Sequence, residues 1–362
     1  MRVGERRRYP PHMPSSPESA PRPVTLDDVA RRAGVSHATA SRVVNGSARR
    51  VDEQYREKVL KAARELRYTP NLAAQAVARG TSHVIALITG GIADAYFSAL
   101  TASVMKAAEE VGLQVSLAVS DRRVDREVEI VRLLRGQRPR AIVLAGTGYL
   151  DNPADSSLVA ELKRYEDTGG RVVMISRADT PFETVDFDNF DGARRLASEL
   201  AGRNYRDPLI IGSSLPLRSM EERVNGFIAG FADHGITISP DRVVRPDFSW
   251  HGVHSFVHTL EREVLEQSDL IFTVTDEAAL GTLSALRERG LNVPGDLALA
   301  GFDDITTLRD VVPRLTTVHV PLDEVGREAV HRATAEPERL RRRVIPTRPI
   351  LRESTPVRPT QG

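Results

Sequence analysis

Beyond residue 82, short apolar runs alternate with longer amphipathic stretches. The apolar runs read as strands at 83–89, 114–119, 141–145, 171–175, 208–212, 270–274 and 297–301. Helical patterns such as 97–111 and 122–135 lie between them. Strand–helix alternation of this kind predicts an α/β fold, with parallel sheets covered by helices on both faces. The segment is longer than one such sheet needs, so we expect a body of two doubly wound lobes.

Three short helical patterns precede this body, between residues 24 and 70. The first begins after Thr25, with Asp28 three residues later in a capping-box arrangement. Gly34 ends this helix, and Ser36 is placed to cap a second one that runs to about Asn45. Segment 24–70 is therefore expected to form a small all-α unit.

The third helix of this unit is expected to begin after Asp52 and to end before Pro70. Its expected apolar stripe consists of Tyr55, Val59, Leu60, Ala63 and Leu66.

The remaining segments lack these patterns. Residues 1–23 contain six prolines and no apolar periodicity, which predicts a disordered extension without the apolar stretch of a secretory signal. Residues 71–81 are expected to be a hinge helix or linker, 82–355 the body, and 356–362 a tail. No run approaches the ~18 apolar residues of a membrane helix, so we expect no membrane partner and a cytoplasmic location. The absence of cysteine excludes disulfides and thiolate chemistry.

Charge is distributed unevenly along the chain. Residues 1–81 contain 16 basic and 8 acidic residues, and the remainder contains 34 basic and 41 acidic residues. A basic head on an acidic body favours binding to a polyanion. An arginine-rich tail attached to an unrelated domain would give the same charge asymmetry. Sequence motifs are therefore needed to distinguish such a tail from a polyanion-binding head.

Several motifs in the head and body occur in one recognisable order. The head contains 24–30 (VTLDDVA), 33–36 (AGVS), 39–45 (TASRVVN), 56–59 (REKV) and 66–71 (LRYTPN). The body contains 188–192 (DNFDG), 223–227 (RVNGF), 275–281 (TDEAALG), 301–304 (GFDD) and 315–318 (LTTV). In this order they closely resemble the LacI/GalR family of bacterial transcription regulators, over roughly 24–355. The resemblance implies a helix-turn-helix headpiece on a two-lobed body like a periplasmic binding protein.

The headpiece resemblance implies contacts to double-stranded DNA. The second helix of such a motif lies in the major groove, where Arg42 can donate two hydrogen bonds to a guanine. His37 can donate to a base acceptor, and Ala38 offers a methyl contact. The short polar side chains suited to phosphate oxygens are Thr25, Ser36, Thr39, Ser41 and Asn45. Plain helix capping is the alternative for Ser36 and Thr39, and a solvated position is the alternative for Arg42.

The family's hinge helix corresponds to residues 71–80 here. In the family this segment pairs with a second copy on DNA and inserts a leucine into the minor groove. The implied contacts are Asn71, Leu72, Ala74 and Val77, with valine at the wedge position. A simple linker is the alternative.

The body resemblance implies an effector in the cleft between the lobes, beyond the carboxyl ends of the strands. The candidates are Asp94, Tyr96, Phe97, Ser176, Arg177, Arg223, Phe248, Thr275, Asp276 and Asp303. Carboxylates, guanidinium groups and aromatic faces together suit a sugar. The alternatives are helix capping for Asp276 and a core position for Phe97.

Two positions depart from the family pattern. Ser176 stands where the family often has an acid, and Thr275 where it often has asparagine. The ligand is therefore either a sugar or something smaller, less polar or phosphorylated, with a purine or a sugar phosphate as alternatives.

An enzyme is the competing class. Gly146 and Gly148 lack the third glycine of a dinucleotide fingerprint, and 212–214 (GSS) is not a nucleophile elbow. His251, His254 and His258 could share a helix face and hold a metal, but a solvated or partly packed face is favoured. No catalytic residue, resident metal or cofactor is expected.

We therefore expect a regulator, specifically a repressor, that binds a pseudo-palindromic operator as a homodimer. Half-sites should lie about one helical turn apart. No leucine heptads follow the helical region 323–335, so a tetramer is not expected. The sequence leaves open whether ligand releases DNA or promotes binding.

Overall fold

The computed structural model describes residues 22–44, 51–70, 82–145, 148–150, 154–176, 180–336 and 341–359. The chain divides into two compact units, Met1–Gln75 and Ala76–Gly362. Asn45, Asn71, Leu72, Ala74, Val77 and Arg177 lie outside the described residues, as does most of the predicted disordered extension.

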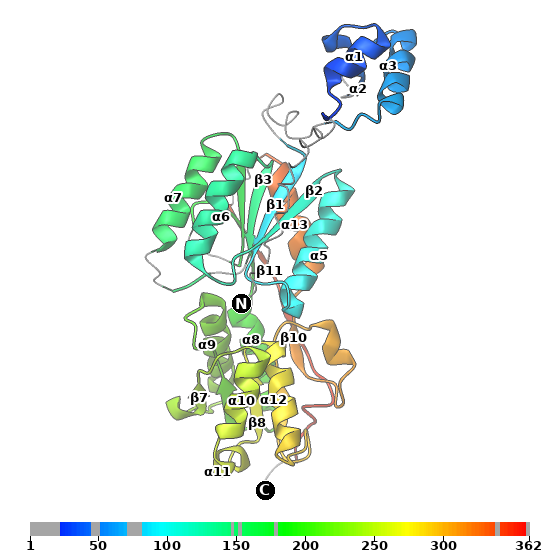
Figure 1. Ribbon diagram of the computed structural model, residues 1–362. Helices are drawn as coiled ribbons and strands as arrows, with labels where there is room; N and C mark the ends of the chain where they lie inside the picture. The colour runs from blue at the N-terminus through cyan, green and yellow to red at the C-terminus, as the bar shows by residue number, and fades with distance from the viewer. Residues whose placement is uncertain are drawn as a thin grey trace, which may run out of the picture. The chain divides into compact units, whose positions relative to one another are not determined.

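The described part of the first unit contains three helices, α1 (Leu26–Ala33), α2 (His37–Val44) and α3 (Glu53–Glu65) (Figure 1). The expected capping box is present, because the Thr25 side chain accepts from the Asp28 amide while the Asp28 carboxylate accepts from the Thr25 amide. Gly34 follows α1 at φ 66°, a left-handed conformation that suits glycine. Asp52 caps α3 by accepting from the amide of Gln54. The sequence therefore predicted these helix ends correctly.

The small core of this unit consists of Val29, Ala30, Ala40, Val59 and Ala62. The stripe predicted for α3 was only partly right, because Tyr55 and Leu60 are exposed. Tyr55 lies in the first turn of α3, and Leu60 is one position round the helix from Val59. A unit of three short helices covers only a narrow face of each, so residues beside that face remain in solvent.

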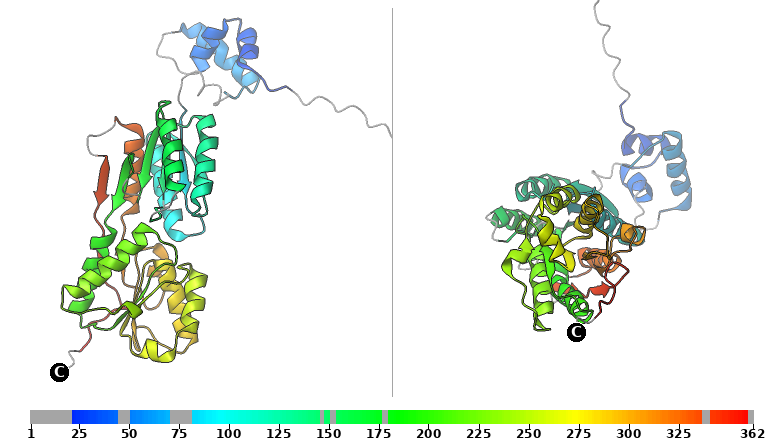
Figure 2. Two further views of the ribbon diagram at one scale, coloured as in Figure 1. Left: turned by 90° about the vertical axis from the view of Figure 1, so that its left-hand side faces the viewer. Right: turned by 90° about the horizontal axis from the view of Figure 1, so that it is seen from below.

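The N-terminal lobe of the body is built on a six-stranded parallel sheet in the order β2-β1-β3-β4-β5-β11. The strands are β1 (Val84–Thr89), β2 (Gln114–Val119), β3 (Ala141–Ala145), β4 (Arg171–Ile175), β5 (Glu183–Phe187) and β11 (Arg342–Ile345). Helices α5 (Ala95–Glu110) and α13 (Leu322–Thr334) cover one face, and α6 (Val124–Gln137) and α7 (Ala154–Glu166) cover the other (Figures 1 and 2). The lobe is doubly wound, as predicted.

The C-terminal lobe repeats this plan on a parallel sheet in the order β7-β6-β8-β9. Its strands are β6 (Pro208–Ile211), β7 (Val243–Val244), β8 (Leu270–Thr273) and β9 (Ala298–Ala300). Helices α8 (Asn189–Gly202) and α9 (Arg218–Ala232) cover one face. The opposite face carries α10 (Trp250–Thr259), α11 (Arg262–Glu266) and α12 (Asp276–Glu288). Two 3-10 turns, η1 (Pro240–Arg242) and η2 (Thr306–Arg309), lie in the connections.

The chain passes between the lobes after β5, after β10 (Thr317–His319) and after β11. Strand β12 (Arg348–Ile350) pairs antiparallel with β10 beside the C-terminal lobe. In both sheets, the strand order reverses next to the first strand of the lobe, at β1 and at β6. Ligands of open α/β sheets bind beyond the carboxyl ends of the strands at such a reversal. Among the described helices, none is both long and apolar enough to cross a membrane.

Candidate functional site

The outer face of α2 carries the predicted base-reading residues. His37, Ala38 and Arg42 are all exposed, whereas Ala40 is buried against α1 and α3. Ala38 and Arg42 are four residues apart, so they lie on one face of the helix. Arg42 makes no hydrogen bond or ion pair with any residue in the described part of the chain. Its guanidinium is therefore available to a ligand.

The predicted phosphate contacts are partly engaged inside the unit. The Thr25 hydroxyl donates to the Asp28 carboxylate over 2.7 Å, and this network lowers the pKa of Asp28 to about 2. Ser36 caps α2 by accepting from the Thr39 amide at 3.2 Å, and the two hydroxyl groups lie 2.9 Å apart. Ser41 is half-buried. Capping therefore occupies Thr25 and Ser36, while the exposed Ser36 hydroxyl can still turn toward a phosphate.

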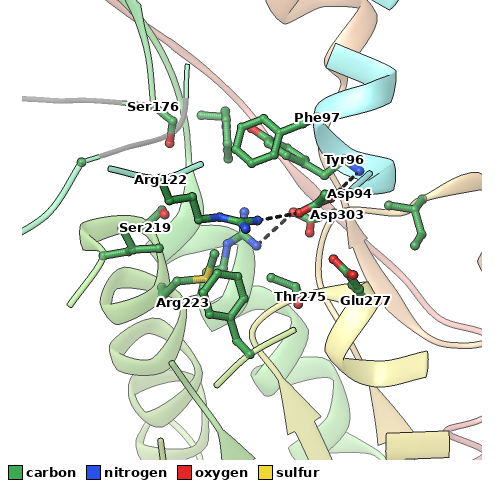
Figure 3. A pocket seen from close by; sticks show the side chains of 16 residues that line it. Asp94, Tyr96, Phe97, Arg122, Ser176, Ser219, Arg223, Thr275, Glu277 and Asp303 are labelled. Carbon is green, nitrogen blue, oxygen red and sulfur yellow. Dashed lines mark hydrogen bonds and ion pairs between the residues drawn. The ribbon is translucent and has the colours of Figure 1, made fainter. Parts of the chain in front are cut away.

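A pocket lies between the two lobes of the body (Figure 3). The space among its lining residues, counted together with the solvent at its mouth, is about 630 Å³. Eight of the ten predicted effector residues line it: Asp94, Tyr96, Phe97, Ser176, Arg223, Phe248, Thr275 and Asp303. They come from segments far apart in the sequence, as the rule of strand carboxyl ends predicts.

Asp276 is the predicted residue that does not line the pocket. It is fully buried beneath Thr275, and its carboxylate accepts from the Ile305 amide at 3.0 Å and the Thr317 hydroxyl at 2.7 Å. Thr275, rather than Asp276, caps α12. Burial raises the pKa of Asp276 to about 7. The carboxylate therefore supports the pocket wall instead of facing the cavity.

A buried ion pair forms the floor of the pocket. Arg223 is 2% exposed, and its guanidinium lies 2.9 Å from the Asp303 carboxylate. The same guanidinium donates to the Val274 carbonyl at 2.7 Å and to Asn189 at 2.9 Å, and it lies over the ring of Phe302. Burial raises the pKa of Asp303 well above its ordinary value, although Arg223 opposes the shift.

In the described part of the chain, the ion pair leaves one carboxylate oxygen of Asp303 without a well-aligned hydrogen bond. Oδ1 of Asp303 faces Arg223 at 2.9 Å but accepts no well-aligned hydrogen bond from the described residues. A buried carboxylate oxygen without an aligned donor is costly unless a ligand supplies one. Asp303 also lines the pocket, where a carboxylate is an acceptor by its chemistry.

Sequence reasoning missed two charged residues of the pocket, Arg122 and Glu277. Arg122 pairs with Asp94 at 2.8 Å and stacks against Phe97 of its own lobe and Phe248 of the other. Glu277 faces Asp94 across the cleft, and burial together with that carboxylate raises the pKa of Glu277. Both follow strand ends directly, so the rule that identified the other candidates could have identified them as well.

The remaining residues missed at the pocket are largely apolar or small: Gly148, Phe187, Leu217, Ser219, Met220 and Ile305. Side chains of these types do not indicate a binding site when only the sequence is known.

Three pocket residues adopt a left-handed backbone conformation without being glycine. They are Arg122 at φ 57°, Ser176 at φ 55° and Asp303 at φ 126°. Such conformations are strained and concentrate at functional sites, where surrounding structure holds them in place. Three of the eight non-glycine residues with positive φ in the described part of the chain therefore line this one cavity.

The lobes also contact each other beside the pocket. The Leu150 amide donates to the Pro216 carbonyl, and the Arg218 amide donates to the Gly148 carbonyl, each over 2.8 Å. Opening the cleft would break these bonds and separate Arg122 from Phe248. A molecule in the pocket would therefore contact residues of both lobes.

A helix-turn-helix unit attached to a binding-protein-like body defines a DNA-binding regulator, and comparisons with known proteins agree. Residues 25–71 match the model for bacterial regulatory proteins of the lacI family, and 197–355 match that for a periplasmic binding protein-like domain. The transcriptional regulator GalS of Salmonella typhimurium is 31% identical over 86% of this chain and 89% of its own length. CelR of Thermobifida fusca is 30% identical over 91% of this chain and 98% of its own.

Solved structures show the same likeness. A lac repressor dimer bound to operator and the anti-inducer ONPF aligns at a TM-score of 0.80, with 26% identity, over 92% of this chain and 100% of that one. A CelR–cellobiose complex aligns at 0.64, with 28% identity, over 91% and 99%. The chain belongs to the lacI family of bacterial regulatory proteins. It is a DNA-binding transcriptional regulator, and the relatives it matches are regulators rather than enzymes.

Proposed function

We propose that this protein is a homodimeric repressor whose affinity for a pseudo-palindromic operator is controlled by a sugar bound between its lobes. The observation that carries the effector class is the pocket itself. It combines the buried carboxylate of Asp303, two guanidinium groups and two aromatic rings, Phe97 and Phe248. Ring hydroxyls suit the polar groups, and the C–H face of a sugar suits the aromatic rings.

Charge argues against a phosphorylated effector. Arg122 and Arg223 are each paired with an aspartate, and Glu277 adds a further carboxyl group. Among the described lining residues, the pocket therefore offers no uncompensated cation to a phosphate, which would lie close to three carboxyl groups. A neutral, hydroxyl-rich ligand avoids this repulsion. A purine base is also uncharged, so this repulsion does not disfavour it. It is the alternative that the binding test has to exclude.

The relatives support this assignment by analogy. CelR was solved with cellobiose, and the lac repressor with operator DNA as a dimer. By the same analogy, Asn45 joins the phosphate contacts, and Asn71, Leu72, Ala74 and Val77 form the minor-groove hinge. Arg177 follows Ser176 at the pocket, and the protein acts in the cytoplasm.

The control mechanism follows from the contacts between the lobes. A ligand that bridges Phe97 and Phe248 favours one arrangement of the lobes, and operator affinity changes only if that arrangement differs between the DNA-bound and free states. The sign of this change is a matter for measurement.

A binding screen tests the proposal. The full-length protein is heated with pentoses, hexoses, disaccharides, sugar phosphates and purines, and a ligand at 100 times its dissociation constant should add about 2.7 kcal/mol of stability. The expected hit is a sugar that loses its effect in Phe248→Ala and keeps it in Arg262→Gln, a variant on the exposed helix α11. A purine hit would replace the sugar assignment, and a hit that Phe248→Ala leaves unchanged would refute the pocket.

A further inference from the structure

Three side chains with metal-binding chemistry converge on the outer surface of the C-terminal lobe. His254 and His258 lie on α10, and Glu288 is the last residue of α12. Nε2 of His254 is 3.1 Å from Oε1 of Glu288, and Nε2 of His258 is 2.9 Å from Oε2. One ligand atom from each residue lies within 4.8 Å of the others, and none of the three lines the interlobe pocket.

We propose that His254, His258 and Glu288 form a binding site for a divalent transition-metal ion, with Zn²⁺ as its representative. Two histidines four residues apart project from the same face of a helix, so they can hold one ion between them. A carboxylate from a neighbouring helix completes three protein ligands, and water takes the fourth tetrahedral position.

The distances suit this geometry. Zinc binds nitrogen and oxygen at about 2.0–2.2 Å, which places tetrahedral donor atoms roughly 3.3–3.5 Å apart. With Oε2 of Glu288 as the carboxylate donor, two of the three donor separations are already 3.2 and 2.9 Å. The remaining separation, between the two histidines, is at most 4.8 Å, so binding requires the two imidazole rings to rotate toward each other.

Local charge also suits a cation. Both imidazole Nε2 atoms lie within hydrogen-bond distance of the Glu288 carboxylate, which is the one acidic ligand of the cluster. His258 lies in the last turn of α10, where the free carbonyl groups carry partial negative charge. Arg289 donates a hydrogen bond to one of these carbonyl groups, that of Val257, at 2.5 Å. Arg289 does not replace any of the three proposed ligands.

The structure separates these residues from the third histidine of the sequence pattern. His251 is exposed and lies edge-on to Trp250, with ring centres 5.0 Å apart, and it is not part of the cluster. The sequence spacing of His251, His254 and His258 gave no reason to choose among them. Glu288, thirty residues beyond His258, could not be associated with them before α10 and α12 were seen to pack together.

Trp250 provides a direct reporter for this site. It is the only tryptophan of the chain, and its ring stacks on His254 with centres 4.8 Å apart and planes 11° apart. A paramagnetic ion such as Cu²⁺ held by His254 would lie close enough to quench its fluorescence. The readout needs neither DNA nor the effector, so this proposal stands apart from the proposed function.

The experiment uses untagged, full-length protein treated with a chelator and then dialysed. Cu²⁺ quenching of Trp250 and Zn²⁺-dependent thermal shift are measured for wild type, His258→Gln, Glu288→Gln and the matched control His251→Gln. We expect saturable binding of one ion per chain in wild type and in His251→Gln. Both cluster variants should bind at least tenfold more weakly while melting at the wild-type temperature without metal.

Three results would overturn the proposal. The first is the absence of saturable binding in wild type. The second is equal affinity in the cluster variants and wild type, which would assign binding to other groups. The third is an equal loss in His251→Gln, which would indicate nonspecific coordination by exposed histidines.

Discussion

Arg223 is expected to hold the C-terminal lobe together, whatever it does for the effector. Its guanidinium is 2% exposed and serves three acceptors, the Asp303 carboxylate, the Val274 carbonyl and the Asn189 side chain. Substitution by methionine keeps most of the side-chain volume and removes every one of these donors. Breaking a buried ion pair from one side costs about 3–5 kcal/mol, because the partner charge stays buried and unpaired.

This magnitude is large beside the ~5–15 kcal/mol that stabilises a typical domain. The raised pKa of Asp303 limits the cost, since the orphaned carboxyl group can take up a proton instead of remaining charged. We therefore expect Arg223→Met to cost about 3 kcal/mol or slightly more. Asp303→Asn leaves Arg223 two of its acceptors, so it should cost less.

A double-mutant cycle measures the pair itself. Urea unfolding followed by Trp250 fluorescence reports on the C-terminal lobe, where this single tryptophan begins α10. The double variant Arg223→Met with Asp303→Asn should be more stable than the sum of the single changes predicts. Arg262→Met, which removes an exposed pair on α11, should have little effect.

Two results would refute this reasoning. One is a loss below about 1 kcal/mol in Arg223→Met, because a buried pair broken from one side should cost several times more. The other is simple additivity in the cycle. A consequence concerns ligand studies: loss of effector binding in an Arg223 variant would not show direct contact, and Phe248 is the better test position.

Three further outcomes are expected. Arg42→Ala should cost about 1–3 kcal/mol of DNA-binding free energy at one base position, measured by competition among operator variants, and a uniform loss would assign Arg42 to phosphates. Gly226→Ala should destabilise the body by about 1–3 kcal/mol in urea unfolding, because a Cβ would lie 2.1 Å from the Phe190 carbonyl, whereas Gly136→Ala on the open face of α6 should not. Folding raises the pKa of Asp276 from 3.8 to about 7. The protonated side chain should therefore stabilise the folded state fully below about pH 4, and this contribution should be lost as the pH rises through 7. Wild type should therefore lose stability relative to Asp276→Asn across this range, and a pH-independent difference would contradict the assignment.

The parts of the fold predicted best are those with strong local signals. All seven predicted strands are present within a residue or two of their expected ends. Six of them are almost completely buried and therefore read as continuous apolar runs, whereas β2 lies at the sheet edge and is partly exposed. The helix ends of the first unit were equally clear from Thr25, Gly34 and Asp52. A helix cap involves residues only a few positions apart, so it can be recognised from the sequence alone.

The strands that the sequence did not predict pair with strands far away in the chain. β11 reads RRVI and pairs with β5, more than 150 residues earlier in the chain. β5, β7, β10 and β12 are similarly short or contain polar residues, and their pairing exists only once the lobes have formed. No local pattern separates such segments from loops.

The pocket was predicted in position but not in detail. Strand ends located its residues, yet the side chain that faces a cavity depends on the turn that follows each strand. Asp276 and Glu277 are neighbours, and the structure buries the first beneath the pocket and points the second into it. The backbone of Arg122, at φ 57°, likewise decides its position and is not visible in the sequence.

The most direct test of the account is operator affinity with and without effector. Operator DNA is first selected from random duplexes with the full-length protein, and its dissociation constant is measured by fluorescence anisotropy at fixed salt, with and without a saturating ligand from the thermal screen. We predict a change of about 5- to 150-fold, the usual range of coupling between two sites, and its loss in Phe248→Ala. An unchanged dissociation constant at saturating ligand would contradict control of DNA binding through the interlobe pocket.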